Sequence, residues 1–368
     1  MKLKEICEYI SDRVAVTAVS KENYISTENM AQNKGGVTRS SSIPSSGAVI
    51  RYTTDDILIS NIRPYFKKIW QADKTGGCSA DVLCIRAKNH IDSTFLYYLL
   101  SQDAFFEYVM TGAKGCKMPR GDKGHIMDWE IDIPEDKSEQ TAIGQCLKML
   151  DKKIEINKQI NDNLEQQASS LLSDWISTYP CRTYKLSDIC KYANAKCETG
   201  NLTPQNYIST ENMLPNKKGI VEASNIPTGK ATWYKVDDIL IANIRPYFQK
   251  IWKADINGGC SADVLCIRAN IESHSPILYW LLHQDAFFEY VMTGAKGCKM
   301  PRGDKQHIMN WSIDLPEVQY WADLATQLGS IDQQIAYNRI ESINLSNLRD
   351  TLLPKLMSGE IKINEIDC

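Results

Sequence analysis

The 368-residue sequence lacks the segments that define several large protein classes. It contains no apolar run of about 18 residues, so we expect no transmembrane helix. The N-terminal stretch MKLKEICEYISDR is charged and has no apolar signal-peptide core. The chain also has no excess of positive charge, because 42 Lys and Arg stand against 45 Asp and Glu. A polyanionic partner would therefore have to meet local basic patches. We expect a cytoplasmic protein with no membrane partner.

Motifs for catalysis and for metal binding are also missing. There is no GxxxxGK[ST] loop for ATP, and neither an FxGxG segment nor the NPPY or DPPY tetrapeptide of an adenine methyltransferase. The twelve cysteines include no CxxC pair and the five histidines are scattered, so we expect no metal site and mostly buried, reduced thiols. We predict that the chain has no catalytic residue and binds no metal or cofactor itself.

What the sequence does contain is one unit written twice. The recurring segments are NYISTENM at 23–30 and 206–213, NIRPYF at 61–66 and 243–248, GGCSADVLCIRA at 76–87 and 258–269, and QDAFFEYVMTGAKGCKMPRGDK at 102–123 and 284–305. We call the repeats copy one, from Lys2, and copy two, from Lys185. A period of about 180 residues is too long for a solenoid and indicates two copies of a domain with its connector.

Each copy begins with strand-rich sequence and ends in helical sequence. Apolar runs such as DILISNI and ADVLCIRA are bounded by turn residues, which is typical of strands. We expect one amphipathic helix from FLYYLLSQDAFFEYVM, then the loop GAKGCKMPRGDK and a short strand, WEIDIP. The stretch DKSE predicts a capping box between Asp136 and Glu139 at the start of a long helix. The predicted segments are domain 1–135, helix 136–178, domain 179–317 and helix 318–368.

The two helical segments carry apolar positions that alternate four and three residues apart. Such a heptad seam favours pairing of the two helices, because one helix alone would expose it to water. Asn157 and Asn338 occupy equivalent positions in the seam, where a polar side chain fixes register. The residues alone leave open parallel pairing, antiparallel pairing, and packing of each helix on its own domain. The predicted helix-pairing residues are Leu147, Leu150, Ile154, Asn157, Leu164, Leu328, Ile331, Ile335, Asn338 and Leu345.

Two segments in each copy have the composition of a DNA-contacting surface, which needs cations for phosphates and polar side chains for base edges. The loop GAKGCKMPRGDK has four cations and one acid, and its glycines allow close approach of a phosphate. The segment NIRPYFKKIW mixes basic and aromatic side chains, and its Arg63 and Lys68 persist in copy two, whereas Lys67 becomes Gln249. The predicted DNA-binding residues are Arg63, Tyr65, Lys68, Lys114, Lys117, Arg120 and Lys123 in copy one, and Arg245, Tyr247, Lys250, Lys296, Lys299, Arg302 and Lys305 in copy two.

In their order and duplication these motifs resemble the specificity subunit of type I restriction–modification systems. YISTENM, ILISNIRPYFKKIW, GGCSADV and GCKMPRGD resemble segments of its target-recognition domains, and LRDTLLPKLMSGEI resembles its C-terminal segment. The resemblance covers essentially the entire chain. It implies an α+β fold with two strand-rich target-recognition domains, each followed by a long helix. The two helices would pair as an antiparallel coiled coil with a pseudo-twofold axis, which acts as a spacer.

The resemblance also implies the partners. Each domain would read one half of a split site in double-stranded DNA, and two methyltransferase subunits would dock on the helices. Whether restriction subunits join them stays open. S-adenosylmethionine, ATP and Mg would be bound by the partner subunits, and adenine N6 methylation would be the reaction of the methyltransferases.

The near identity of the copies favours two equal half-sites in inverted orientation, which form a palindromic or near-palindromic site with an unread gap. The half-sites would differ if Arg39 or Arg51 read bases, because copy two has other residues there. Two other functions stay open: a coiled-coil scaffold with two protein-binding domains, and an enzyme with an unrecognised active site.

Overall fold

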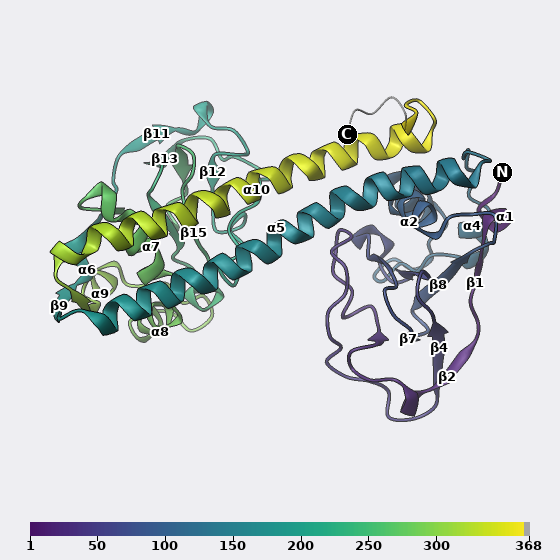
Figure 1. Cartoon of the computed structure of the whole chain (residues 1–368), viewed down its shortest axis with the longest axis horizontal. Coiled ribbons are helices and arrows are strands. Elements are labelled where there is room, and N and C mark those ends of the chain that lie inside the picture. Colours follow the sequence, from purple (N-terminus) through teal and green to yellow (C-terminus); the bar gives the residue numbers. More distant parts are fainter. Residues whose placement is uncertain (364–368) are drawn as a thin grey trace. The chain divides into compact units, whose positions relative to one another are not determined.

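The chain divides into two compact units in the computed structural model, which describes residues 1–363. Unit 1 contains Met1–Ile156 and the chain from Glu341 onward, and unit 2 contains Asn157–Ile340. Each unit holds the globular part of one copy and one portion of each of two long helices, α5 (Lys137–Thr178) and α10 (Trp321–Met357), drawn in Figure 1. No helix within the described range combines the length and apolarity that a membrane crossing requires.

Two four-stranded sheets and four short helices form the globular part of unit 1. The strands are β1 (Cys7–Tyr9), β2 (Arg13–Ala15), β3 (Tyr24–Ile25), β4 (Ala48–Tyr52), β5 (Ile57–Ser60), β6 (Ile69–Gln71), β7 (Gly76–Cys78) and β8 (Val82–Ala87). The helices are α1 (Leu3–Ile6), α2 (Ser93–Ser101), α3 (Asp103–Thr111) and α4 (Lys123–Met127), with 3-10 turns at Val16–Ala18 and Pro64–Phe66. The first sheet has the antiparallel order β1–β8–β5–β6, and the second has the order β2–β4–β7–β3, in which β3 and β7 run parallel.

Strand β5 shows why the apolar run DILISNI forms a strand. All four of its residues are buried, because both of its faces are covered. Ile57 and Ile59 pack in the core beneath α2 and α3, whereas Leu58 packs beside Tyr52 in the core shared with the second sheet. Alternation of side chains along a strand therefore serves two cores at once. The strands predicted from DILISNI and ADVLCIRA are confirmed as β5 and β8.

The segment predicted as one amphipathic helix forms two helices, α2 and α3, so that prediction was wrong. Gln102 separates them with an extended backbone, at φ −65° and ψ 147°. The break allows Phe95 of α2 and Phe105 of α3 to reach the same core, where both are fully buried. Packing of two apolar faces on one core therefore outweighs the continuity of a single helix.

Unit 2 repeats this architecture. Its strands are β9 (Cys181–Lys185), β10 (Cys190–Tyr192), β11 (Lys196–Glu198), β12 (Tyr207–Ile208), β13 (Lys230–Tyr234), β14 (Ile239–Ala242), β15 (Ile251–Lys253), β16 (Gly258–Cys260), β17 (Val264–Ala269) and β18 (Ser312–Pro316). Its short helices are α6 (Leu186–Ile189), α7 (Ser275–Leu282), α8 (Asp285–Thr293) and α9 (Lys305–Met309), with 3-10 turns at Thr199–Asn201, Pro246–Phe248, Glu272–His274 and Val318–Tyr320. The two main sheets have the orders β10–β17–β14–β15 and β11–β13–β16–β12, which match those of unit 1.

The strand predicted from WEIDIP is present in copy two, as β18, which pairs antiparallel with β9. In copy one the equivalent segment bonds to Met1, which exchanges two 2.9 Å hydrogen bonds with Ile131. Next to it, Lys2 and Glu130 form an isolated antiparallel bridge, so this pairing does not extend to a strand in copy one. The prediction was therefore right for copy two and wrong for copy one.

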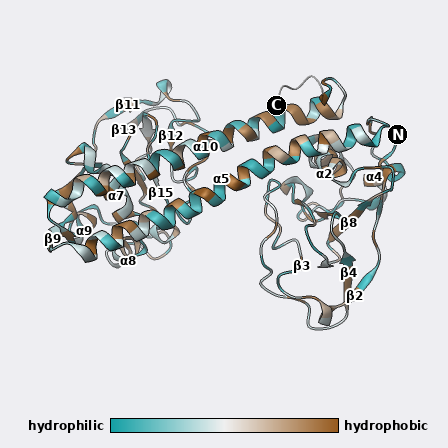
Figure 2. Cartoon of the chain, viewed as in Figure 1, coloured by the Kyte–Doolittle hydropathy of each residue, from teal (hydrophilic) through white to brown (hydrophobic). Residues whose placement is uncertain are grey.

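Helices α5 and α10 pack against each other in opposite directions within each unit. In unit 2 Trp175, near the end of α5, meets Trp321, at the start of α10, with ring centroids 5.8 Å apart. In unit 1 Ile143 and Leu147, early in α5, share a core with Leu356, late in α10. Figure 2 shows apolar positions recurring along both otherwise hydrophilic helices. The predicted α+β fold with an antiparallel helix pair is confirmed, whereas the exact domain boundaries stay predictions.

Equivalent asparagines meet within the helix pair of unit 2. The side chain of Asn157 donates to the carbonyl oxygen of Asn338 at 3.4 Å, and Asn338 Nδ2 donates to Asn161 Oδ1 at 2.8 Å. Asn157 and Asn338 are both buried. Since they are the same position of the two copies, their contact marks a local twofold axis of the helix pair. A shift in register would separate buried amides from their partners, so these residues favour one register.

A carboxylate on each long helix anchors the globular part of its own unit. Asp151 of α5 accepts a 2.6 Å hydrogen bond from the Tyr98 hydroxyl. The equivalent carboxylate of α10, Asp332, accepts a 2.9 Å bond from Trp280 Nε1. Tyr98 and Trp280 are themselves equivalent positions of α2 and α7. The joint between domain and helix is thus the same in both units, although the donor differs.

The cations that balance these carboxylates come from different elements. Asp151 pairs with Arg349 of α10 at 2.5 Å, whereas Asp332 pairs with Lys253 of β15 at 2.6 Å. Both side chains of the Lys253–Asp332 pair are nearly buried, at 13% and 10% exposed. Burial raises the pKa of Asp332. Removal of Lys253 would therefore leave a buried carboxylate without its ion-pair partner.

Two smaller predictions have mixed outcomes. Asp136 caps α5, but it accepts from the backbone and hydroxyl of Ser138, at 2.9 and 2.5 Å, rather than forming the predicted box with Glu139. Seven of the eleven described cysteines are buried and all eleven are free thiols, as predicted. Cys116 and Cys298 differ, because they lie exposed in the basic loops. No group of residues that could hold a metal ion occurs within the described range.

Candidate nucleic-acid interface

The two segments predicted to bind DNA lie side by side in copy one. We call residues 112–123 the basic loop and residues 61–68 the arginine turn. The backbone N–H of Arg63 donates to the carbonyl of Pro119 at 2.8 Å, and the N–H of Gly121 donates to the carbonyl of Asn61 at 3.2 Å. Segments about 50 residues apart in sequence therefore form one surface, which sequence alone did not reveal.

The basic loop is a small hairpin. Lys114 and Arg120 exchange two backbone hydrogen bonds of 2.9 Å, which close the hairpin at its base. Gly115 has φ +99°, a conformation that residues with a Cβ rarely adopt. Pro119 is buried under the loop, whereas Cys116, Lys117 and Met118 at the tip are exposed. The tip is therefore presented to solvent from a fixed base.

Asp122 holds the far end of the loop. One carboxylate oxygen accepts from the backbone N–H groups of Gly124 and His125, both at 3.0 Å, and so caps α4. The other oxygen pairs with Lys114 Nζ at 2.6 Å. The Lys114 ammonium and the backbone donors lower the pKa of Asp122 to about 2. The one acid of the loop thus has a structural use and neutralises one of its four cations.

His125 supports the loop from behind. Its ring stacks on Tyr108 with centroids 4.3 Å apart, and its Nε2 lies 3.0 Å from the Thr111 hydroxyl. A Cβ at Gly112 would lie 2.2 Å from the His125 ring, so the first glycine of GAKG is needed for close approach. These contacts give His125 a structural role behind the basic loop.

The arginine turn has an unusual backbone. Arg63 and Lys67 both have left-handed conformations, at φ 51° and φ 50°, on either side of the 3-10 turn Pro64–Phe66. Non-glycine residues in this region cost about 1 kcal/mol or more each, and such positions concentrate at ligand-binding sites. The turn projects Tyr65, which is 46% exposed, with its ring 4.7 Å from that of Phe66.

Several predicted cations already have partners within the domain. Arg120 pairs with Asp81 at 3.0 Å, and Lys68 Nζ donates to the carbonyl of Thr27 at 2.6 Å. Desolvation lowers the pKa of Lys68. Lys123 lies over a tyrosine ring, with Nζ 5.7 Å from the centroid of Tyr9. Sequence reasoning did not find Asp81, Thr27 or Tyr9, because nothing in their local sequence reveals these long-range contacts.

Three predicted cations of copy one, Lys117, Arg63 and Lys123, have neither a hydrogen bond nor an ion pair from their side chains in the described part of the chain. Lys117 is exposed at the tip of the basic loop. Arg63 is partly buried, and its Nε is a buried donor without a hydrogen-bond partner. Its guanidinium carbon lies 5.9 Å from the ring centroid of Phe66. The open positions for a ligand are therefore Lys117, Arg63, Lys123 and the exposed ring of Tyr65.

Copy two reproduces this geometry. Arg245 N–H donates to the Pro301 carbonyl at 2.7 Å, and the loop is closed by two 2.9 Å bonds between Lys296 and Arg302. The further equivalents are Lys296–Asp304 at 2.6 Å, Arg302–Asp263 at 2.9 Å, Lys250 to the Thr210 carbonyl at 2.6 Å, Lys305 at 5.7 Å from the Tyr192 ring, and Tyr247 at 49% exposed. Lys299 is exposed, and Arg245 Nε is again buried without a hydrogen-bond partner.

Comparison with known proteins identifies the family that carries this duplicated surface. Residues 1–166 match the model of the type I restriction modification DNA specificity domain, and copy two repeats the motifs of copy one. The type I restriction enzyme MjaIX specificity subunit of Methanocaldococcus jannaschii is 23% identical over 318 residues, which cover 76% of this chain and 71% of that protein. The EcoDI specificity subunit of Escherichia coli is 22% identical over 329 residues, with 74% and 70% covered. Residues 1–166 therefore contain a type I restriction modification DNA specificity domain, and the chain as a whole is similar to the specificity subunits of type I restriction–modification systems.

A solved structure agrees on the fold. The crystal structure of the type I restriction–modification S subunit from M. genitalium matches with a TM-score of 0.60 at 17% identity, covering 97% of this chain and 95% of that one. The basic loops and arginine turns therefore lie on a chain with the fold of an S subunit, and the basic loop and arginine turn of copy one lie within the residues that match the DNA specificity domain. Which of its side chains touch DNA stays a prediction.

The predicted helix-pairing residues of this chain lie along α5 and α10. Leu147, Asn157, Leu328 and Asn338 are buried, and the others are partly exposed: Leu150, Ile154, Leu164, Ile331, Ile335 and Leu345. In unit 2, Ile331 and Ile335 of α10 pack against the core that contains Ala168 and Leu172 of α5. The assignment of the whole set to pairing stays a prediction.

Arg39 and Arg51, the two candidate readers that copy two replaces with other residues, lie in a connection of the second sheet and on that sheet. Arg51 is on β4, and its equivalent, Trp233 on β13, lies with its ring 5.6 Å from the Arg268 guanidinium. Arg39 pairs with Glu22 at 2.9 Å, whereas its equivalent Glu222 accepts from a glutamine side chain at 3.2 Å. These positions are separate in sequence from both basic segments. The two basic segments thus have the same geometry in both copies despite changes on the neighbouring sheet.

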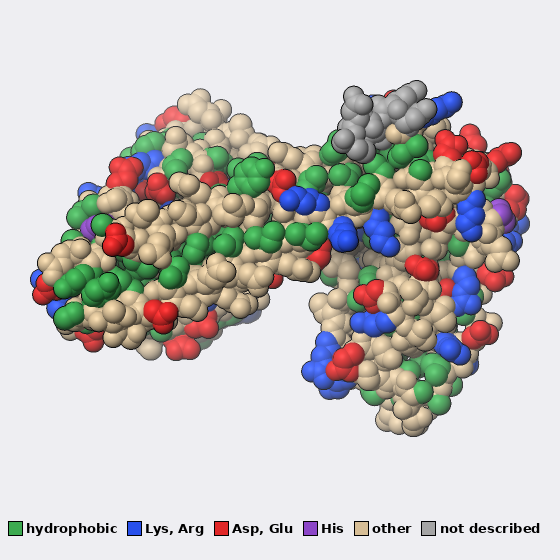
Figure 3. All heavy atoms as spheres, in the orientation of Figure 1, with side chains coloured by type: hydrophobic (Ala, Val, Ile, Leu, Met, Phe, Trp, Pro, Cys, Tyr) green, Lys and Arg blue, Asp and Glu red, His purple; other side chains and the backbone are tan. Residues whose placement is uncertain are grey.

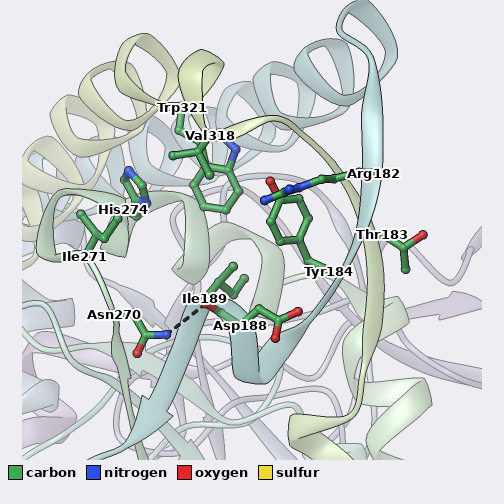
Figure 4. A pocket seen from close by; sticks show the side chains of 10 residues that line it. All are labelled: Arg182, Thr183, Tyr184, Asp188, Ile189, Asn270, Ile271, His274, Val318 and Trp321. Atoms are coloured by element: carbon green, nitrogen blue, oxygen red, sulfur yellow. Dashed lines mark hydrogen bonds between the residues drawn. The ribbon is translucent and has the colours of Figure 1, made fainter.

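Unit 2 also contains a cavity of about 380 Å³, shown in Figure 4. It lies where β9, α6, the turn before α7 and the start of α10 converge, and Arg182, Tyr184, His274 and Trp321 contribute to its wall. Burial lowers the pKa of His274. Since none of its lining residues belongs to the basic loop or arginine turn of copy two, the cavity is not part of the candidate interface.

Proposed function

We propose that this chain is a specificity subunit that reads a bipartite DNA site in which the two half-sites are the same sequence, or nearly so, in inverted orientation. One basic loop with its arginine turn contacts each half-site. The gap between the half-sites is unread and is set by the helix pair. The single observation that carries this proposal is the duplication of the interface: the basic loop is identical in the two copies, its main contacts recur, and the arginine turn differs only at Lys67, which is Gln249 in copy two.

The matching geometry supports equal half-sites. Lys114 and Lys296 have the same 2.6 Å ion pair, and Arg63 and Arg245 have the same left-handed backbone, at φ 51° in both. Two surfaces with the same donors in the same positions select the same base edges. A difference between half-sites would need a reader among residues that differ, such as Arg51.

The helix pair supports the inverted orientation. Asn157 and Asn338 are equivalent and meet each other, so the pair has a local twofold axis. Duplex DNA also has twofold axes perpendicular to its own axis, and symmetric readers pair with palindromic sites for this reason. A palindromic or near-palindromic target follows.

Methyltransferase subunits are the proposed partners on the helices, and restriction subunits stay an open addition. In unit 2 the helix pair exposes Ile160, Tyr337 and Ile340, at 38%, 61% and 47%. Figure 3 shows hydrophobic side chains at the surface along these helices. Exposed apolar residues gathered on a helix pair are typical of a surface that another subunit covers. The partners would bind S-adenosylmethionine, ATP and Mg, and the methyltransferases would methylate adenine N6.

Methylome sequencing tests the target. The chain is expressed with its methyltransferase partner in cells that lack other adenine methyltransferases. We expect one bipartite methylated motif whose two halves are reverse complements. Two unrelated half-motifs would overturn the equal-reader proposal, and the absence of any bipartite motif would overturn the proposed function.

A binding titration tests the need for the partner. The net charge of the chain is −3, so few phosphate contacts are available to the isolated chain relative to its complex. We expect the isolated chain to bind cognate duplex at least tenfold more weakly than the complex at 150 mM salt. Equal affinities would contradict the proposal, and so would a complex that retains cognate and random duplexes alike.

A further inference from the structure

The cations of the candidate interface differ in what they already hold. In copy one Lys114 and Arg120 have ion pairs with Asp122 and Asp81, at 2.6 and 3.0 Å. Lys68 gives a hydrogen bond to a backbone carbonyl at 2.6 Å. Each of these groups would have to leave or share a partner to bind DNA. Phosphates and base edges are therefore met first by the remaining groups, which are Lys117, Arg63 and Lys123.

Lys123, the first residue of α4, and Arg63 are the remaining cations with a fixed backbone, and of these two only Arg63 has a forked side chain that can donate two bonds side by side. The N–H of Arg63 bonds to Pro119, its carbonyl accepts from Phe66 at 2.9 Å, and its φ of 51° is stabilised by both neighbours. Lys117, by contrast, lies on the exposed tip of a hairpin. A reader of base edges must hold its donors within a narrow geometry, whereas a phosphate contact tolerates a flexible chain.

The side chain of Arg63 also has an unmet donor. Its Nε is buried and has no hydrogen-bond partner within the described residues, and the same is true of Arg245. Buried donors without partners are rare because each costs about 1–3 kcal/mol. The Arg63 guanidinium carbon lies 5.9 Å from the Phe66 ring, beside the exposed Tyr65. The terminal nitrogens of the guanidinium also have no acceptor among the described residues and, unlike Nε, are not buried, so they are the donors that a base edge beside the exposed Tyr65 can reach.

We infer that Arg63 and Arg245 each read a guanine through its O6 and N7 acceptors in the major groove, and that Lys117 and Lys299 contact phosphates. Guanine is the base that presents two acceptors side by side, which match the fork of an arginine. This inference rests on the proposed function and adds one base to it: each half-site contains a guanine at the same position, on opposite strands.

The test uses the complex of the full chain with its methyltransferase partner and compares Arg63→Ala, Arg63→Lys and Arg245→Ala with Lys117→Ala. Methylome sequencing of each variant gives the motif. We expect Arg63→Ala to make one guanine position degenerate in one half-site, with the other half-site unchanged. Arg245→Ala should produce the mirror image, so each copy is the control for the other. Lys117→Ala should leave the motif unchanged.

Binding to modified duplexes tests the contact itself. Loss of a bidentate pair to guanine weakens binding about 5- to 150-fold. We expect a duplex with 7-deazaguanine at that position, which lacks the N7 acceptor, to bind wild type about tenfold more weakly. Arg63→Ala should bind both duplexes equally, and Arg63→Lys should also lose the discrimination, because lysine keeps the charge without the fork.

Either of two outcomes would overturn the inference. The first is Arg63→Lys with the wild-type motif and affinity, which would make Arg63 a phosphate contact. The second is an Arg63→Ala motif without a degenerate position while binding weakens equally on all sequences. In both cases the wild-type complex would still read a bipartite motif, so the proposed function would survive. A wild-type complex with no sequence preference would overturn both the inference about Arg63 and the proposed function. Melting curves identify a variant that fails to fold. If Arg63→Ala fails, the motif and affinity of Arg63→Lys, which changes the structure least, decide whether Arg63 reads guanine.

Discussion

Replacement of the two loop-tip lysines, Lys117→Ala with Lys299→Ala, separates the phosphate contacts of this chain from the rest of its structure. Both lysines are exposed, and within the described range neither side chain has a hydrogen bond or an ion pair. Their removal therefore leaves no acid unpaired. Lys114→Ala would be a poorer test, because it would free Asp122, which also caps α4.

The magnitude follows from counterion release. Each phosphate contact contributes about −0.9 to the slope of log K against log salt on B-form DNA. Loss of two contacts should therefore make the slope shallower by about 1.8. Between 50 and 200 mM salt, a fourfold range, wild type should lose about 12-fold more affinity than the double variant. The difference between the proteins is thus largest at low salt.

Fluorescence anisotropy titrations of the methyltransferase complex on cognate and random duplexes provide the measurement. We expect the double variant to weaken binding on both duplexes by the same factor, since phosphate contacts carry no sequence information. Lys21→Ala with Lys191→Ala, two exposed lysines, one in each copy and outside the basic segments and the long helices, is the matched control for a change of charge alone. An unchanged salt slope, or a loss confined to the cognate duplex, would refute the assignment of the loop tip to phosphates.

Three further predictions concern stability and assembly. Burial lowers the pKa of His283 to about 3, so below the unfolded pKa of about 6.5 the unfolded chain gains a proton that the folded chain does not. The free energy of unfolding should fall by up to about 1.4 kcal/mol per pH unit as pH drops from 6.5 toward 3. Urea unfolding of His283→Ser, which introduces the serine found at the equivalent position of copy one, should show a flatter dependence on pH. An unchanged dependence would show that His283 is not the cause. Lys253→Met should destabilise unit 2 by about 3–5 kcal/mol in the same assay, because Asp332 stays buried without its ion pair. The double variant with Asp332→Leu should recover much of this loss. Full stability of Lys253→Met alone would show that the ion pair is not needed. The double variant Asn157→Leu with Asn338→Leu should raise the melting temperature but broaden the distribution of oligomers in sedimentation velocity, because a fully apolar seam allows more than one helix register. A single sharp species would contradict the role of these asparagines in fixing the register.

The fold was largely accessible from the sequence, because its signals are periodic and repeated. The heptad seam predicted the long helices, and the run DILISNI predicted β5. The break at Gln102 was not accessible, because both flanking segments carry helical patterns. Only the packing of Phe95 and Phe105 on one core decides it. The parallel or antiparallel choice was open for a similar reason: equivalent seams align either way, and the contact of Trp175 with Trp321 settles it.

The sequence predicted the set of cations in the candidate site, but not which of them are available to a ligand. Lys68 and Lys117 look alike in sequence, since both are lysines in basic segments repeated in copy two. Lys68 Nζ bonds to a carbonyl 41 residues earlier in the chain, whereas Lys117 is exposed. Contacts of this range depend on the tertiary fold. The buried Nε of Arg63 is likewise a property of the folded turn alone.

The two copies also separate what the fold requires from what a ligand requires. Gln140 in copy one and Trp321 in copy two are equivalent residues, and each donates a 2.8 Å hydrogen bond to the carbonyl of the corresponding proline, Pro134 or Pro316. The fold needs a donor at this position and accepts two very different side chains. The tip of the basic loop has no such contact to preserve, because Lys117 is exposed, yet the twelve residues of the loop are the same in both copies. Where the fold leaves a residue free and the copies still agree, the common requirement lies outside the chain. In the proposed function, an equal half-site of DNA bound at each loop would supply that requirement.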